Sequence, residues 1–215
     1  MMYDMNTLKY QDYTKPWWYK NLNEGVSLKN KLFMSVAAFM LTSYTQVYHP
    51  IVNADLAKDL GVDKADLYQS VRDGKWTIDE FAELCHLGTF DLNGDGVLNH
   101  LDQWGFQTEA YGGYALALGA GYRIADKDEN DIPQFILGNE AETTMMLKIM
   151  DLMYDTDHVI NVMIPAINGT TFFQNNHSLY MWTRGSAVFN LREMEVDFGI
   201  LPNPKADEQQ ENYYS

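Results

Sequence analysis

The sequence predicts an α/β fold, with a mixed sheet flanked by helices. Apolar runs suited to buried strands alternate along the chain with segments whose apolar residues recur at helical spacing. Of the 215 residues, 46% are hydrophobic, which is enough for a sizeable core in one large domain or two small ones. Cys85 is the only cysteine, so no disulfide within the chain contributes to this fold.

Strands are expected where apolar residues run together. The segment KLFMSVAAFM at 31–40 is a continuous apolar run typical of a buried strand, and WGFQTE at 104–109 predicts a shorter one. Two further strands are expected nearer the end of the chain. They are SAVFNL at 186–191 and DFGILPNP at 197–204, where prolines close the second.

Helices are expected between these runs. Thr77 and Glu80 have the T-x-x-E spacing of a capping box, which predicts a helix that begins after Thr77 and leads to Asp91. Two earlier helices end at glycines, and the glycine-rich segment GGYALALGAGYRI predicts a tightly packed helix or helix pair. The expected helices lie at about 53–61, 63–74, 77–90, 112–124 and 141–155.

Charge and motif content exclude several function classes. The chain has 15 basic and 30 acidic residues, a formal charge of -15, so nucleic acid and anionic membrane surfaces are improbable partners. No apolar stretch is long enough to span a bilayer, and the first residues lack the pattern of a secretory signal. The five histidines are scattered, and no phosphate-binding loop, nucleotide fingerprint or nucleophile elbow occurs. We therefore do not expect an enzyme.

The stretch DLNGDGVLNHLD at 91–102 has the ligand spacing of an EF-hand-like calcium loop, with Gly96 at its sixth position. The alternative is a polar turn rich in Asn and Asp. The twelfth position is Asp rather than Glu and no second loop occurs, so any bound Ca²⁺ is expected to be structural rather than regulatory. The candidate ligands are Asp91, Asn93, Asp95, the carbonyl of Val97, Asn99 and Asp102.

Four segments in order resemble one family. KPWWYKN at 15–21, DLYQSVRDGKWTIDEF at 66–81, DLNGDGVLNHLDQWGF at 91–106 and REMEVDFGILPNPKADEQQENYYS at 192–215 are similar to extracellular solute-binding proteins of bacterial ABC importers. The likeness is to family 1, the carbohydrate-binding branch, and covers nearly the whole chain. It implies a periplasmic-binding-protein-like (type II) lobe.

The resemblance also implies a function. Such receptors have two lobes that close on a sugar and hand it to a membrane permease of the ABC importer. Family members begin with a lipoprotein signal and a first lobe, so this chain resembles the second lobe alone of an extracellular protein. We expect residues 1–30 to be a polar and aromatic lead-in, and residues 31–215 to form the lobe, ending in a hinge-proximal segment.

The candidate sugar contacts are aromatic, carboxylate, amide and guanidinium side chains, which recognise the apolar faces and hydroxyls of sugars. Several follow predicted strands, where open α/β sheets bind ligands. The family pattern is shortened between Phe189 and Arg192, which is expected to remove contacts from the cleft. The candidates are Glu109, Tyr111, Tyr44, Asn190, Arg192, Trp17 and Trp18.

Two other classes stay open. A calcium-dependent adhesion or scaffold module would use the loop at 91–102 as its defining feature. A glycan-acting hydrolase would need an acid and base pair, such as Glu109 with Glu193 or Glu195.

Overall fold

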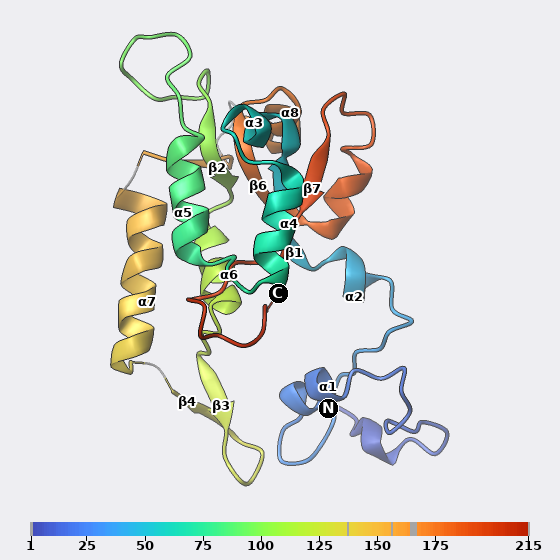
Figure 1. The fold of residues 1–215 in the computed structure, drawn as a ribbon. Coiled ribbons are helices and arrows are strands. Elements are labelled where there is room, and N and C mark those ends of the chain that lie inside the picture. Colours follow the sequence, from blue (N-terminus) through green and yellow to red (C-terminus); the bar gives the residue numbers. More distant parts are fainter. Residues whose placement is uncertain (1, 137, 156, 164–166, 215) are drawn as a thin grey trace. The chain divides into compact units, whose positions relative to one another are not determined.

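The computed structural model describes residues 2–136, 138–155, 157–163 and 167–214. The chain divides into two compact units, one formed by Met1–Val47 and Arg123–Asn139, the other by Tyr48–Tyr122 and Glu140–Ser215 (Figure 1). Among the described residues, no helix is both long enough and apolar enough to cross a bilayer.

A five-stranded sheet forms the centre of the larger unit. Strand β2 pairs in parallel with both β5 and β6, whereas β1 runs antiparallel to both of its neighbours, β6 and β7. The sheet is therefore mixed, as the sequence predicts. Its strands, in spatial order, are β5 (Val159–Asn161), β2 (Trp104–Thr108), β6 (Ser178–Arg184), β1 (Tyr48–Asn53) and β7 (Phe198–Ile200).

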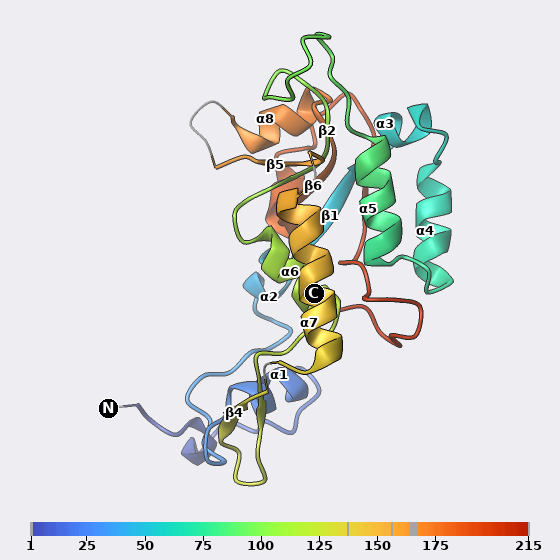
Figure 2. The same cartoon turned by 90° about the vertical axis from the view of Figure 1, so that its left-hand side faces the viewer.

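Helices cover both faces of this sheet, because alternate strand residues point to opposite sides. Val52, Phe106 and Tyr180 belong to the main core on one face, whereas Ile51 and Met181 belong to a smaller core on the other. Figure 2 shows α4 and α5 on one side of the sheet and α8 on the other. The helices of this unit are α3 (Ala54–Asp59), α4 (Lys64–Arg72), α5 (Ile78–Leu87), α6 (Gly112–Gly119), α7 (Glu140–Met150), continued by a π-helical turn (Asp151–Asp155), α8 (Gly169–Gln174) and the 3₁₀ helix η3 (Gly185–Phe189).

The capping box predicted for α5 is half formed. The Thr77 side chain accepts a hydrogen bond from the backbone N–H of Glu80, as a helix N-cap should. The Glu80 carboxylate instead accepts a hydrogen bond from the Ser70 hydroxyl at 2.6 Å, and burial raises the pKa of this carboxyl. Glu80 therefore links α5 to α4 rather than closing the box.

The smaller unit has short elements held together by polar contacts. It contains η1 (Met5–Thr7), α1 (Lys20–Val26), α2 (Thr42–Thr45) and a hairpin of β3 (Ala125–Lys127) with β4 (Pro133–Phe135). Within the hairpin, the Lys127 ammonium forms an ion pair of 2.7 Å with Asp131, and Asp131 also accepts a hydrogen bond from the Ser27 hydroxyl. This network ties the hairpin to the residues that follow α1.

Two predicted strands are wrong. Residues 31–40 contain isolated bridges but no regular strand, and Met34 and Phe39 are exposed rather than buried. Residues 186–191 mostly lie in η3, where Val188 packs against the smaller core without pairing to a strand. The predicted strands at 104–109 and 197–204 are confirmed, although each is shorter than expected.

Candidate binding cleft

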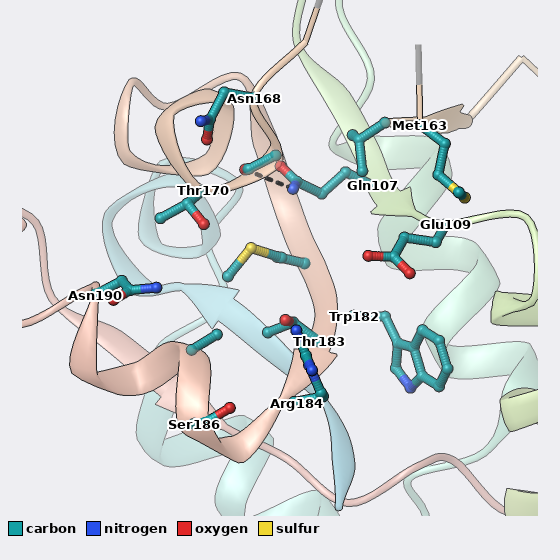
Figure 3. A pocket seen from close by; sticks show the side chains of 14 residues that line it. Gln107, Glu109, Met163, Asn168, Thr170, Trp182, Thr183, Arg184, Ser186 and Asn190 are labelled. Carbon is teal, nitrogen blue, oxygen red and sulfur yellow. Dashed lines mark hydrogen bonds between the residues drawn. The ribbon is translucent and has the colours of Figure 1, made fainter. Parts of the chain in front are cut away.

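A polar cleft of about 320 Å³ lies at the carboxyl ends of β2 and β6 and beside the residues that follow β5 (Figure 3). In open α/β sheets this edge is where ligands bind. The side chains come from four segments of the larger unit. The lining residues are Gln107 in β2 and Glu109 just after it; Val162 and Met163 after β5; Asn168, Gly169 and Thr170 at the start of α8; Met181, Trp182, Thr183 and Arg184 in β6; and Ser186, Ala187 and Asn190 after β6.

Gln107 fixes the floor of the cleft. Its Nε2 donates to the Gly169 carbonyl at 2.7 Å, and its Oε1 accepts from the Ser178 hydroxyl, also at 2.7 Å. The Gln107 side chain is almost fully buried, so both ends of the amide are satisfied by protein groups. It therefore holds the start of α8 against the sheet and leaves ligand contacts to its neighbours.

An aromatic cluster forms one wall. The Trp182 ring stacks on Tyr48, with ring centroids 4.5 Å apart, and its indole N–H donates to the Asn203 amide oxygen at 3.3 Å. Tyr111 packs edge-on against the same indole, with centroids 5.8 Å apart. Trp182 is buried by these contacts, so it offers the cleft a fixed edge rather than an open stacking face.

The cleft is close to neutral in charge. Among its described lining residues, Glu109 is the one carboxylate and Arg184 the one guanidinium. Figure 3 shows Glu109 and Trp182 on one side and Thr170 and Asn190 on the other. Hydroxyl and amide groups, together with one negative and one positive side chain, suit an uncharged ligand that presents many hydroxyls.

The structure brings some predicted site residues together and not others. Glu109 and Asn190 line the cleft, and Tyr111 lies beside it against Trp182. Arg192 instead lies over the Phe189 ring at 5.3 Å, and its Nε donates to the Phe189 carbonyl at 3.3 Å. Despite the short connection before Arg192, Asn190 remains in the cleft.

The three remaining candidates belong to the smaller unit. Trp18 packs against Tyr13 and Phe39, Trp17 is about half exposed, and Tyr44 lies in α2. Their part in ligand binding stays a prediction.

Sequence reasoning missed the contribution of β6. Trp182 and Arg184 line the cleft because SLYMWTR at 178–184 is a strand, which the sequence analysis did not predict. Its signal is present in the sequence as an aromatic, apolar run that ends at Arg184 and Gly185.

The predicted calcium loop folds as a series of turns closed by side-chain oxygens. The Asp91 carboxylate accepts hydrogen bonds from the backbone N–H groups of Gly94 and Gly96, both at 2.7 Å, and these bonds lower the pKa of Asp91, with Gly96 the largest cause. Gly94 and Gly96 have φ of 73° and 78°, which glycine adopts without strain. The loop therefore contains the turns that its Asn, Asp and Gly residues favour.

The carboxylate at the twelfth position has a different environment. Asp102 is fully buried, and its two oxygens accept hydrogen bonds from the backbone N–H groups of Leu92 and Asn99. Within the part of the chain that the structure describes, no group of three or more His, Cys, Asp or Glu side chains lies close enough to hold a metal ion. Calcium binding would therefore need the amide and carbonyl oxygens of the loop, and it stays a prediction.

Solved structures share the fold of this chain. An ABC substrate-binding protein from Listeria monocytogenes, solved in complex with cycloalternan, is 14% identical and matches with a TM-score of 0.56 over 94% of this chain and 47% of its own. UspC from M. tuberculosis is 14% identical, with a TM-score of 0.58 over 96% of this chain and 51% of its own. The Thermus thermophilus maltotriose-binding protein, bound with maltotriose, is 16% identical, with a TM-score of 0.52 over 92% and 46%.

These likenesses confirm the periplasmic-binding-protein-like α/β part of the predicted fold class, whereas the EF-hand-like loop stays a prediction. The chain has the α/β fold of a periplasmic-binding-protein-like lobe and spans about half the length of the structures it matches. No family model and no curated protein matches its sequence.

Proposed function

We propose that this chain binds a neutral oligosaccharide as part of an extracellular solute receptor that serves an ABC importer. The observation that carries the proposal is the cleft at the carboxyl ends of β2 and β6, with its hydroxyl and amide lining and its balanced charges. The structural neighbours support it, since two of the three described above were solved with an oligosaccharide bound.

In this proposal each group of the cleft has a separate role. Arg184 and Glu109 donate to and accept from sugar hydroxyls, while Thr170 and Asn190 bond the opposite side of the sugar ring. Gln107 and Trp182 position these groups, because their polar atoms bond the Gly169 carbonyl, the Ser178 hydroxyl and the Asn203 amide. Closure of a second lobe would remove the bound sugar from water, and a permease would then receive it.

The chemistry of the cleft favours binding over hydrolysis. A glycosidase needs two carboxyl groups flanking one bond, about 5 to 9.5 Å apart. Among the described residues that line the cleft, Glu109 is the one carboxylate, whereas Glu193 lines a neighbouring recess with Phe189, Asn190 and Arg192. We therefore assign no catalytic role to Glu109.

We also propose that the 91–102 loop binds Ca²⁺ weakly and for structural purposes. The Asn and Asp spacing and the two positive-φ glycines support this reading. A calcium-dependent adhesion module would need the loop to form a partner surface, for which we find no specific support.

The test is an amide NMR titration with maltotriose, cycloalternan and a panel of other neutral oligosaccharides. We expect saturable shifts at Thr170, Thr183 and Asn190, and loss of saturation in Asn190→Ala and Glu109→Gln. Arg192→Ala is the matched control, since its guanidinium packs on Phe189, and it should titrate as the unmodified protein does. A well-dispersed spectrum in which no saccharide moves the cleft amides would refute the proposal.

A further inference from the structure

Two histidines that are 72 residues apart in the sequence form a close pair in the larger unit. The Nδ1 atom of His86, in the last turn of α5, lies 2.8 Å from the Nε2 atom of His158, just before β5. Their rings meet nearly edge to face, with centroids 4.5 Å apart and planes at 73°. Neither histidine lines the cleft.

The two facing nitrogens are close enough to form one hydrogen bond between the rings. At 2.8 Å, a single proton can lie between the rings, donated by one nitrogen and accepted by the other. If both nitrogens carried protons, the two N–H groups would point at each other. The arrangement therefore requires at least one lone pair that faces the partner ring.

The surroundings keep His158 in its neutral form. Burial lowers the pKa of His158, and the neighbouring His86 lowers it further, while the Asp157 carboxylate acts in the opposite direction. Among the described residues, the other ring nitrogen of His158 finds no hydrogen-bond partner and is buried. Nε2 is thus the nitrogen through which this ring interacts.

The same spacing fits two ligands of one metal ion. Imidazole nitrogens bind Zn²⁺ at about 2.0 to 2.1 Å, so two of them at angles of 90° to 109° lie about 2.9 to 3.4 Å apart. The observed distance of 2.8 Å between the two nitrogens would have to increase by a few tenths of an ångström. A small side-chain rotation of the exposed His86 supplies this increase. The ion would take the place of the shared proton.

We propose that His86 and His158 form a two-histidine site for a divalent transition-metal ion such as Zn²⁺, Ni²⁺ or Cu²⁺. Imidazole is a preferred ligand of these ions, whereas Ca²⁺ and Mg²⁺ prefer oxygen. Because no third His, Cys, Asp or Glu joins the pair among the described residues, water completes the coordination. Such an open site releases its ion readily and is distinct from the 91–102 loop.

Metal binding here would link two elements of the fold. His86 belongs to α5, which packs against β2, and the carbonyl of His158 accepts a hydrogen bond from the Phe106 N–H of β2 at the start of the β5 pairing. An ion held by both rings would therefore join the helix to the edge strand β5. The residues that follow this strand, Val162 and Met163, line the cleft.

The experiment is a calorimetric titration of the full chain with ZnCl₂ at pH 7.5, in buffer with excess CaCl₂ to occupy oxygen sites. We expect one saturable Zn²⁺ site per chain, which is lost in His86→Gln and in His158→Gln. His100→Gln is the matched control, because His100 is also exposed and is neither a member of the pair nor a candidate ligand of the 91–102 loop in which it lies, and it should bind as the unmodified protein does.

Two further readouts make the outcome specific. Binding should weaken in acid as His158, whose pKa burial lowers below the ordinary imidazole value, takes up a proton, and Zn²⁺ should slow hydrogen exchange of the Phe106 amide. Undiminished Zn²⁺ binding by a folded His86→Gln protein would overturn the proposal, as would equal loss in His100→Gln. Because these measurements contain no saccharide, neither result bears on the proposed function.

Discussion

Gln107 and Ser178 share a buried hydrogen bond of 2.7 Å between neighbouring parallel strands, directly under the cleft. Through its other end, Gln107 holds the carbonyl of Gly169 at the start of α8. One amide therefore joins two strands and a helix, and the position of Thr170 in the cleft depends on it.

Replacing Gln107 with alanine should destabilise the protein by about 1 to 3 kcal/mol, because the buried Ser178 hydroxyl and the partly buried Gly169 carbonyl lose their partner. Urea denaturation followed by fluorescence measures this change as a lower midpoint. Gln209→Ala is the control, since Gln209 is exposed and such changes stay within about 0.5 kcal/mol. Equal midpoints for the two variants would show that the buried amide contributes little.

Gly105→Ala should be more damaging than any cleft variant. A Cβ added to Gly105 would lie 1.9 Å from the carbonyl oxygen of Cys85, so α5 would have to move away from β2. Overpacking against backbone costs about 3 kcal/mol or more. Gly113→Ala is the matched control, because its Cβ would meet Met153 at an ordinary 3.5 Å and alanine favours a helix by up to about 1 kcal/mol. A folded Gly105→Ala protein with unchanged thermal stability would contradict the close approach seen here.

Local patterns predicted the helices better than the sheet. The cap at Thr77 and the glycines Gly61 and Gly74 lie next to the helices that they begin or end, so their signal is contained within a few residues. Strand pairing depends instead on residues far apart, and an apolar run reports burial rather than extension. The run at 186–191 is apolar because Val188 and Leu191 pack on the smaller core, although the backbone there is mostly 3₁₀ helix.

The site was predictable in part for the same reason. Glu109 was found because its strand was recognised, and the general rule then placed it at the ligand edge. Trp182 and Arg184 were missed together with β6. The pairing of His86 with His158 has no sequence signal, since the two residues meet through the packing of α5 beside β5.

Stability should fall in mild acid, partly because of His49 in β1. Burial lowers the pKa of His49 in the folded protein, whereas the unfolded chain has an ordinary pKa of about 6.5. As the pH falls through about 6.5, the unfolded chain therefore binds more protons than the folded protein, and the free energy of unfolding decreases. At higher pH, His49 is neutral in both states and has no such effect. His49→Gln should reduce the drop in urea midpoint between pH 8 and pH 5.5. The effect will be partial, because burial lowers the pKa of His158 in the same direction, and an unchanged drop would exclude a contribution from His49.

Calcium should stabilise the protein through the 91–102 loop, and weakly. Sites of the extracellular class have dissociation constants of about 10⁻⁴ to 10⁻³ M, and a tenfold excess over such a constant stabilises by about 1.4 kcal/mol. The expected result is a rise in melting temperature with millimolar CaCl₂ that MgCl₂ does not reproduce.

Asp91→Ala will itself destabilise the loop, since the N–H groups of Gly94 and Gly96 lose their acceptor. The decisive quantity is therefore the calcium-dependent increase in melting temperature of each variant. That increment should vanish in Asp91→Ala and persist in Asp59→Ala, a change at the exposed end of α3. If calcium raises the melting temperature of Asp91→Ala as much as that of the unmodified chain, the ion binds elsewhere and the loop is a set of turns closed by its own side chains.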